Sequence, residues 1–120
     1  MKKHIKIYRF EHPENGRGIF RNNLANSGVC DNIDERHADF NVPEMDGVDL
    51  YKDDLEWFCA YKSKEDVKAW IKLEEFKHLL KLGFQLKELV VTNYQEGFHQ
   101  VIFTKDSIQN TKYITQYSTL

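Results

Sequence analysis

The chain is 120 residues long with a mass of 14.3 kDa, which is enough for one domain with its own hydrophobic core and too little for two. We therefore expect residues 1–120 to form a single domain. A formal net charge of -2 and a sequence pI near 6.2 argue against the strongly basic surface that duplex nucleic acid requires, so no direct nucleic-acid binding is expected.

The cysteines, histidines and apolar segments indicate neither a metal site nor membrane insertion. Cys30 and Cys59 lie far apart and form no CxxC pair, which favours reduced thiols in a cytoplasmic protein. The five histidines form no HExxH motif and no pair one helical turn apart, so we predict no metal. No signal peptide is recognisable at the start of the chain, and no apolar run is long enough to cross a bilayer.

The first predicted elements are a strand and a long irregular segment. Residues 4–10 alternate in the pattern of a strand, which directs Arg9 toward the core side near the strand's end. Pro13, Gly16 and Gly18 then predict a loop. Residues 19–24 show a weak helical pattern, and residues 25–54 show little periodicity. An irregular segment of this length is more typical of a functional loop than of a scaffold.

The strongest structural signal is a short apolar strand, beginning at Trp57, that leads into a helix. Ser63 is a typical N-cap, and Asp66 stands at the return position of a capping box. The helix is predicted to continue as far as Gly83. Its apolar face has helical spacing and consists of Ala69, Leu73, Phe76 and Leu80, widened by Trp70 and Ile71.

The rest of the chain predicts strands. Residues 84–92 are rich in β-branched and apolar side chains, residues 93–97 supply a turn, and residues 99–104 return as the second strand of an antiparallel hairpin. A weaker alternation over residues 107–117 predicts a final strand. These elements predict an α+β domain in which an antiparallel sheet is packed by one main helix. The expected core anchors are Trp70, Phe76, Leu80, Phe84 and Val101.

Two local motifs are compatible with chemistry but lack its usual frame. Ser63 is not surrounded by a GxSxG elbow, so we expect it to cap the helix rather than to act as a nucleophile. Gly16-Arg17-Gly18 lacks the strand–turn–helix frame of a phosphate-binding loop and predicts a turn. Together with Arg9, however, Arg17 can form a small anion site near the end of the first strand.

Three short stretches resemble the ADP-ribosyltransferase family. Tyr8-Arg9 resembles the Arg or His at the end of that family's first strand, and residues 58–63 resemble its aromatic or Ser-bearing strand before a helix. Residues 99–103, His-Gln-Val-Ile-Phe, resemble its late strand of the type ExEVLF, which begins with Glu or Gln. The stretches YRFEHPENGRG and YKSKEDVKAWI are also similar to small proteins encoded by phages and prophages.

The resemblance implies an ADP-ribosyltransferase-like split sheet with a cleft that binds the nicotinamide end of NAD. Arg9 is then expected to contact the ribose or phosphate, and Arg17 also belongs to the cofactor site. Tyr61 is expected to stack on the nicotinamide ring, and Ser63 to support the cleft wall. Gln100 takes the position of the catalytic acid, so the implied catalytic set is Arg9, Tyr61 and Gln100.

Gln100 is the departure from the family pattern that matters for the chemistry. Breaking the nicotinamide–ribose bond develops an oxocarbenium-like cation, which a carboxylate stabilises far better than a neutral amide does. Three outcomes stay open: transfer is slow, a neighbour such as Glu96 substitutes, or the site binds without reacting. A structural role is also open, with Arg9 at the sheet edge, Tyr61 in the core and Gln100 on a surface strand.

A second function, from a different class, is a non-enzymatic phage inhibitor that binds a host defence enzyme in the host cytoplasm. The irregular segment from Asp31 to Asp54 is strongly acidic, so it can meet a basic groove on a protein partner or remain a solvated loop. The partner is a nucleotide-type small molecule in the first function and a host protein in the second. The acidic residues of this segment are Asp31, Asp34, Glu35, Asp39, Glu44, Asp46, Asp49, Asp53 and Asp54.

Overall fold

The structure of the protein is a computed structural model that describes residues 3–14, 47–98 and 100–120. The loop predicted around residues 16–18, the weak helix at residues 19–24 and most of the acidic segment lie outside these described residues. The elements in chain order are β1 (Ile5–Glu11), a 3-10 helix (Lys52–Asp54), β2 (Phe58–Ala60), α2 (Lys64–Trp70), α3 (Leu73–Lys81), β3 (Gln85–Val91), β4 (Tyr94–Glu96), β5 (Val101–Phe103), a 3-10 helix (Lys105–Ser107), β6 (Ile108–Ile114) and a 3-10 helix (Tyr117–Thr119).

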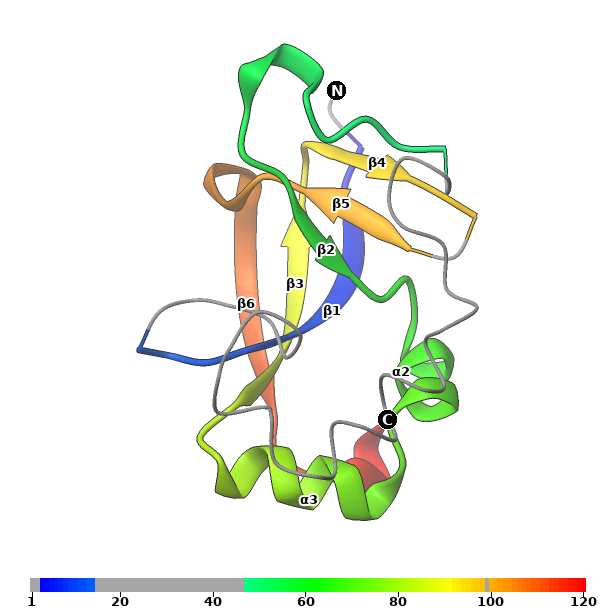
Figure 1. The fold of residues 1–120 in the computed structure, drawn as a ribbon, viewed down its shortest axis with the longest axis vertical. Coiled ribbons are helices and arrows are strands. Elements are labelled where there is room, and N and C mark those ends of the chain that lie inside the picture. Colours follow the sequence, from blue (N-terminus) through cyan, green and yellow to red (C-terminus); the bar gives the residue numbers. More distant parts are fainter. Residues whose placement is uncertain (1–2, 15–46, 99) are drawn as a thin grey trace.

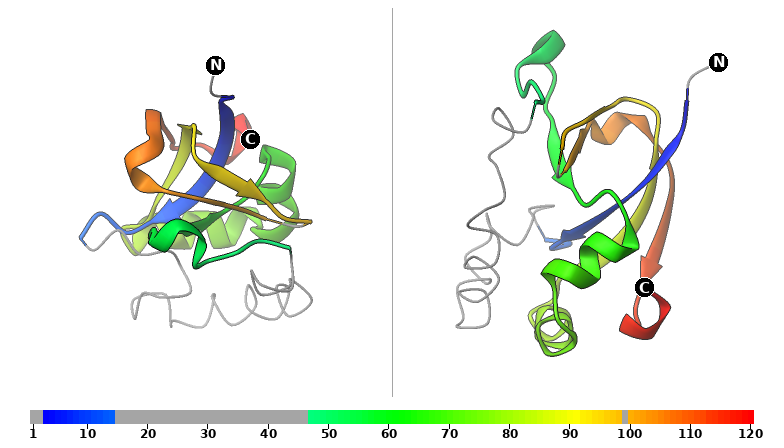
Figure 2. Two further views of the ribbon diagram at one scale, coloured as in Figure 1. Left: turned by 90° about the horizontal axis from the view of Figure 1, so that it is seen from above. Right: turned by 90° about the vertical axis from the view of Figure 1, so that its right-hand side faces the viewer.

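The strands form two antiparallel three-stranded sheets, in the orders β1-β3-β6 and β2-β5-β4. An isolated antiparallel bridge between Tyr8 of β1 and Tyr61, which follows β2, joins the two sheets at their edges. Backbone pairing therefore links the strands in the order β4-β5-β2-β1-β3-β6. The helices α2 and α3 lie at one end of the strands (Figure 1). The right-hand view of Figure 2 shows the same two helices together below the strands.

The first sheet has a core on each of its faces, because successive side chains of a strand point to opposite sides. Ile7 of β1 and Leu89 of β3 pack with Phe103 of β5 in the cluster between the two sheets. Tyr8 and Phe10 point the other way and join the cluster that the sheet forms with α2 and α3. The α+β class is confirmed, and the described residues form two antiparallel three-stranded sheets with two α-helices where one main helix was predicted.

The predicted helix start is confirmed, and the predicted helix length is wrong. The Ser63 Oγ atom accepts a hydrogen bond from the backbone N–H of Asp66 at 3.1 Å, which caps α2. However, α2 ends at Trp70, and α3 starts again with a new cap in which the Glu75 side chain accepts from the backbone N–H of Lys72 at 2.8 Å. No helix of the described residues is long and apolar enough to span a membrane.

The helix breaks because Ile71 is buried in an extended conformation. Its φ is -119° and its ψ is 117°, and its side chain is 0% exposed. The break shifts the helical phase, so that Leu73, predicted on the buried face, is 42% exposed. Trp70 and Leu80 are only half-buried. The predicted anchors Phe76, Phe84 and Val101 are confirmed as buried. The helices also bury Val67 and Leu79, and Ile71 is buried between them.

Gly83 ends α3 as predicted, in a conformation that favours glycine. Its φ is +96°, and a Cβ atom at this position would lie only 2.8 Å from Nε2 of His12. The Nδ1 atom of His12 accepts from the backbone N–H of Glu14, so Nε2 carries the proton and donates to the Leu82 carbonyl at 3.1 Å. The end of β1 is thereby fixed to the end of α3.

The strands predicted at residues 4–10, 57–62, 84–92 and 107–117 are confirmed as β1, β2, β3 and β6, but the predicted hairpin is wrong in its pairing. β3 and β5 belong to different sheets, and Tyr94 pairs with Phe103 in a β4–β5 hairpin instead. The chain crosses between the sheets just after Val91, where the backbone N–H of Thr104 donates to the Asn93 carbonyl at 3.2 Å. The segment predicted as a turn therefore contains β4.

Replacing Phe76 with alanine should lower the free energy of unfolding by about 3–5 kcal/mol, because large buried rings leave a cavity when truncated. The Phe76 side chain is 2% exposed and its ring packs edge-on against Phe10 at 6.1 Å. Leu73→Ala is the matched control on the same helix and should cost about 0.5 kcal/mol or less. Urea unfolding followed by circular dichroism measures both, and equal losses would mean that α3 presents a different face to the core.

Candidate functional site

The predicted site residues lie around the junction of the two sheets, which we call the seam. At the seam the backbone N–H of Tyr8 donates to the Tyr61 carbonyl at 3.0 Å, and the N–H of Tyr61 donates back to the Tyr8 carbonyl at 2.7 Å. This pair is an isolated bridge rather than part of a ladder. Side-chain contacts are therefore needed to hold the two sheets in one orientation.

Arg9 supplies such a contact, because it extends from β1 to β2. Its Nη1 atom donates to the Cys59 carbonyl at 2.6 Å, and its guanidinium carbon lies 5.3 Å from the centroid of the Phe58 ring. The residue is 8% exposed, so the expectation that Arg9 points toward the core side is confirmed. A buried, charge-assisted hydrogen bond to a carbonyl gives the seam a defined geometry.

Glu11 is the centre of a buried ion-pair network, the Glu11 cluster, which comprises Arg9, Glu11, Lys87 and Lys105. Glu11 Oε1 lies 2.7 Å from Arg9 Nε and 3.3 Å from Lys105 Nζ, and Oε2 lies 3.0 Å from Lys87 Nζ. Burial alone would raise the pKa of Glu11, but the hydrogen bonds and positive charges of Arg9 and Lys87 outweigh it and hold this pKa below its ordinary value. Glu11 therefore stays ionised at neutral pH.

Tyr61 and Gln100 both lie next to the last residue pair of the β2–β5 ladder. Ala60 pairs with Val101, and Tyr61 follows this pair on one strand while Gln100 precedes it on the other. Tyr61 is half-buried against the helix-side core, and Gln100 is 4% exposed. The Gln100 carbonyl accepts from the backbone N–H of Gly97 at 2.8 Å, which closes the turn between β4 and β5. Gln100 is therefore not on an exposed surface strand.

The other predicted residues are Ser63, Glu96 and Arg17, and none of them lies at the seam in the described part of the chain. The Ser63 oxygen accepts the capping hydrogen bond of α2. Glu96, the suggested substitute carboxylate, is exposed on β4 and pairs with Val101, the residue that Ala60 pairs with from the other side. Arg17 lies outside the described residues.

A family model described as the Bacteriophage T4 Y00F protein matches residues 1–116. The chain belongs to this phage family. No curated protein and no solved structure matches it. The predicted similarity to phage-encoded proteins is thus confirmed, whereas the family's description names no NAD binding and no transferase activity.

The sequence indicated Arg9 in this Y00F-family protein but not the other three members of the Glu11 cluster, Glu11, Lys87 and Lys105. One signal was available, because Arg9 and Glu11 stand two residues apart on a strand and therefore share a face. Their opposite charges on one buried face predict an ion pair. Lys87 and Lys105 carried no such signal, since their positions depend on strand pairing and on the turn after β5.

One pocket lined by described residues lies on the helix-side face of the first sheet. It has a volume of about 190 Å³ and includes Glu88 of β3 and Lys112 of β6, which are register partners. Glu88 follows Lys87 directly, so the two side chains point to opposite faces. None of Arg9, Tyr61, Ser63 and Gln100 lines this pocket, so the expected NAD cleft does not coincide with it.

Metal ligands do not gather in the described part of the chain: no three His, Cys, Asp or Glu side chains there lie close enough to hold an ion. Cys59 lies on β2 and is half-buried. The seam offers a buried guanidinium paired with a carboxylate, a phenol and an amide.

The Glu11 cluster should make stability depend on acidity. Because the folded-state pKa of Glu11 is lowered, its ion pairs stabilise the fold above the ordinary pKa of 4.5, and this contribution is lost as the pH falls through the folded-state value. Glu11→Gln should lower the free energy of unfolding by about 3 kcal/mol at neutral pH, because it leaves buried cations without their counter-charge. Urea titrations of variant and parent should converge as the pH falls below 4.5.

Glu96→Gln is the control for this experiment, because Glu96 is an exposed carboxylate and forms no part of the Glu11 cluster. Its unfolding curve should follow the parent's at every pH. A Glu11→Gln variant as stable as the parent at neutral pH would show that the cluster adds no net stability.

Proposed function

We propose that the protein is a phage-encoded, ADP-ribosyltransferase-like domain that binds NAD or a related nucleotide at the seam and transfers ADP-ribose slowly or not at all. The proposal is supported by the division of the strands into two three-stranded sheets, which is the split arrangement that the resemblance implies. It also rests on the positions of Arg9 near the end of β1, Tyr61 just after β2 and Gln100 just before β5.

The observation that carries the proposal is the Tyr8–Tyr61 bridge. It sets Arg9, the residue after Tyr8, beside β2, where its guanidinium contacts Cys59 at 2.6 Å. The same bridge fixes Tyr61, which follows Ala60, and Ala60 pairs with Val101, the residue after Gln100. Backbone pairings thus connect β1 through Tyr8 and Tyr61 to β2 and through β2 to β5, which Gln100 directly precedes.

The roles follow from the chemistry of each group. Tyr61 offers an aromatic face for a nicotinamide or adenine ring. Arg9 supplies positive charge for a ribose or phosphate oxygen, with the neighbouring ammonium of Lys105 also over the Phe58 ring at 4.3 Å. Gln100 can hydrogen-bond a ribose hydroxyl but cannot neutralise the cation that forms when nicotinamide leaves, so binding is favoured over turnover.

NAD should raise the melting temperature if it binds at the seam, because a ligand that binds only the folded state adds about 2.7 kcal/mol at a hundredfold excess over its dissociation constant. Tyr61→Phe keeps the ring and should keep the shift, whereas Tyr61→Leu keeps apolar bulk and should abolish it. Tyr51→Leu is the matched control, since Tyr51 is 78% exposed and lies in the turn before β2. An unchanged melting temperature at millimolar NAD would contradict the proposal.

Gln100→Glu extends the same experiment to chemistry. A carboxylate at this position should increase the release of nicotinamide from NAD, because it stabilises the transition state more than the ground state. Since Gln100 is buried, circular dichroism must first show that the variant is folded. Nicotinamide release that stays at the level of the parent would mean that residue 100 does not face the reacting bond.

The inhibitor function remains the second candidate because of one described turn. Asp53 and Asp54 both have left-handed backbone conformations, with φ of 58° and 54°, and both are exposed. Tyr51 beside them is 78% exposed and Leu55 is 38% exposed. Strained, exposed residues with aromatic and acidic side chains are suited to contact a basic protein surface. If NAD does not bind, charge reversal of Asp53 and Asp54 is the change to test against a host partner.

A further inference from the structure

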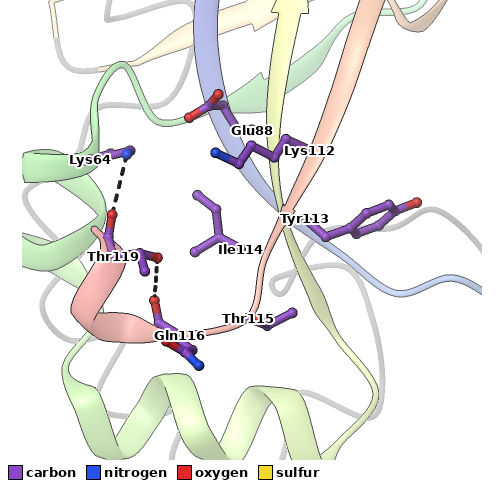
Figure 3. A pocket seen from close by; sticks show the side chains of 8 residues that line it. All are labelled: Lys64, Glu88, Lys112, Tyr113, Ile114, Thr115, Gln116 and Thr119. Carbon is purple, nitrogen blue, oxygen red and sulfur yellow. Dashed lines mark hydrogen bonds between the residues drawn. The ribbon is translucent and has the colours of Figure 1, made fainter.

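The pocket on the helix-side face of the first sheet is built from three parts of the chain. Its volume is about 190 Å³, and Figure 3 shows its walls formed by α2, β3, β6 and the segment after β6. The Ile114 side chain stands at its centre, whereas the Tyr113 ring points away from it. The residues that matter for recognition are Lys64, Glu88, Lys112, Ile114, Gln116 and Thr119.

Glu88 is the most deeply buried polar group of this pocket, with 9% of the residue exposed. Its Oε2 atom accepts a hydrogen bond from the Tyr8 hydroxyl at 3.1 Å. Its Oε1 atom lies 4.0 Å from Lys6 Nζ, which is too far for a hydrogen bond. The carboxylate thus retains acceptor capacity toward the pocket, since an ionised carboxylate can accept about four hydrogen bonds.

Tyr8 keeps this carboxylate in its place. Burial raises the pKa of Tyr8 to about 12, helped by the hydrogen bond to Glu88 and by the negative charges of Glu88 and Glu65. The phenol therefore stays protonated and continues to donate to Glu88 throughout the physiological pH range.

The charges around Glu88 select the kind of donor that a ligand can offer. Lys6 lies near one carboxylate oxygen, and Lys112 is the register partner of Glu88 on β6. The positive charges of Lys6 and Lys112 would repel a ligand ammonium but would not repel a neutral hydroxyl. Glu88 is therefore suited to accept from hydroxyl groups.

The same lysines favour an anionic group elsewhere on the ligand. Lys64 and Lys112 approach the pocket from opposite walls, one from α2 and one from β6 (Figure 3). Lys64 Nζ donates to the Thr119 carbonyl at 3.3 Å, and Thr119 Oγ1 donates to the Gln116 carbonyl at 2.7 Å, which fixes the wall on that side. Ile114, a mostly buried residue of the helix-side core, lines the pocket between them.

We propose that this pocket binds a small phosphorylated sugar, with the hydroxyls on Glu88 and the phosphate between Lys64 and Lys112. The sugar phosphate is either free or part of a nucleotide. Arg9 pairs with Lys87 and so points to the opposite face of the first sheet from Glu88, and none of Arg9, Tyr61 and Gln100 lines the pocket. This site is therefore separate from the one proposed for NAD.

Titrating the isotope-labelled protein with ribose 5-phosphate, AMP and inorganic phosphate, followed by amide chemical shifts, tests the proposal. Ribose 5-phosphate should shift the amides of Glu88, Lys112 and Gln116 at millimolar concentration or below, and inorganic phosphate should bind more weakly. Lys112→Gln should weaken ribose 5-phosphate about tenfold, the value of one charge-assisted hydrogen bond. Lys81→Gln is the matched control, because Lys81 is an exposed lysine on α3 outside the pocket.

Glu88→Gln tests the hydroxyl contact separately, because it removes a negative charge but keeps the size of the side chain. Inorganic phosphate should then bind more tightly, and the preference for ribose 5-phosphate should shrink. AMP that shifts the same amides more strongly than ribose 5-phosphate supports the nucleotide as the source. No shift with any sugar phosphate, equal binding of phosphate and ribose 5-phosphate, or shifts confined to Tyr61 and Gln100 would overturn the proposal.

Discussion

The bridge between Tyr8 and Tyr61 is the interaction on which the rest of this structure depends. Two reciprocal backbone hydrogen bonds, at 3.0 and 2.7 Å, join two sheets that are otherwise separate ladders. Arg9 reinforces the junction by donating to the Cys59 carbonyl, and Glu11 keeps the guanidinium paired. Because an unpaired charge inside a protein is costly, the ion pairs of Arg9 and Glu11 and the backbone bridge support one another.

Tyr8 also connects the two proposed sites. Its backbone belongs to the seam, and its hydroxyl donates to Glu88 in the pocket. A change that displaces β1 would therefore alter both sites. The protein belongs to a phage family that matches residues 1–116. Both proposals assign it a small, phosphorylated ligand, bound at the seam in one and in the pocket in the other.

The sequence predicted those features that depend on neighbouring residues. Strand alternation located β1 and the burial of Arg9, the Ser63 cap located the start of α2, and Gly83 located the end of α3. Features that depend on distant contacts were missed. The break at Ile71 arises from burial against a core assembled from other elements, and the partner of β5 depends on where the chain crosses between sheets. For the same reason Lys87, Lys105 and the pocket lysines carried no local signal, and the roles of Tyr61 and Gln100 stay predictions.

Native-state hydrogen exchange at the amides of Tyr8 and Tyr61 tests most directly whether the seam unites the two sheets. Both amides donate across the seam, so they should exchange only through global unfolding, with the same free energy as the β3 amides at the centre of the first sheet. The contradicting result would be exchange of the Tyr8 and Tyr61 amides through a local opening of much lower free energy while β3 stayed protected, because the two sheets would then separate independently.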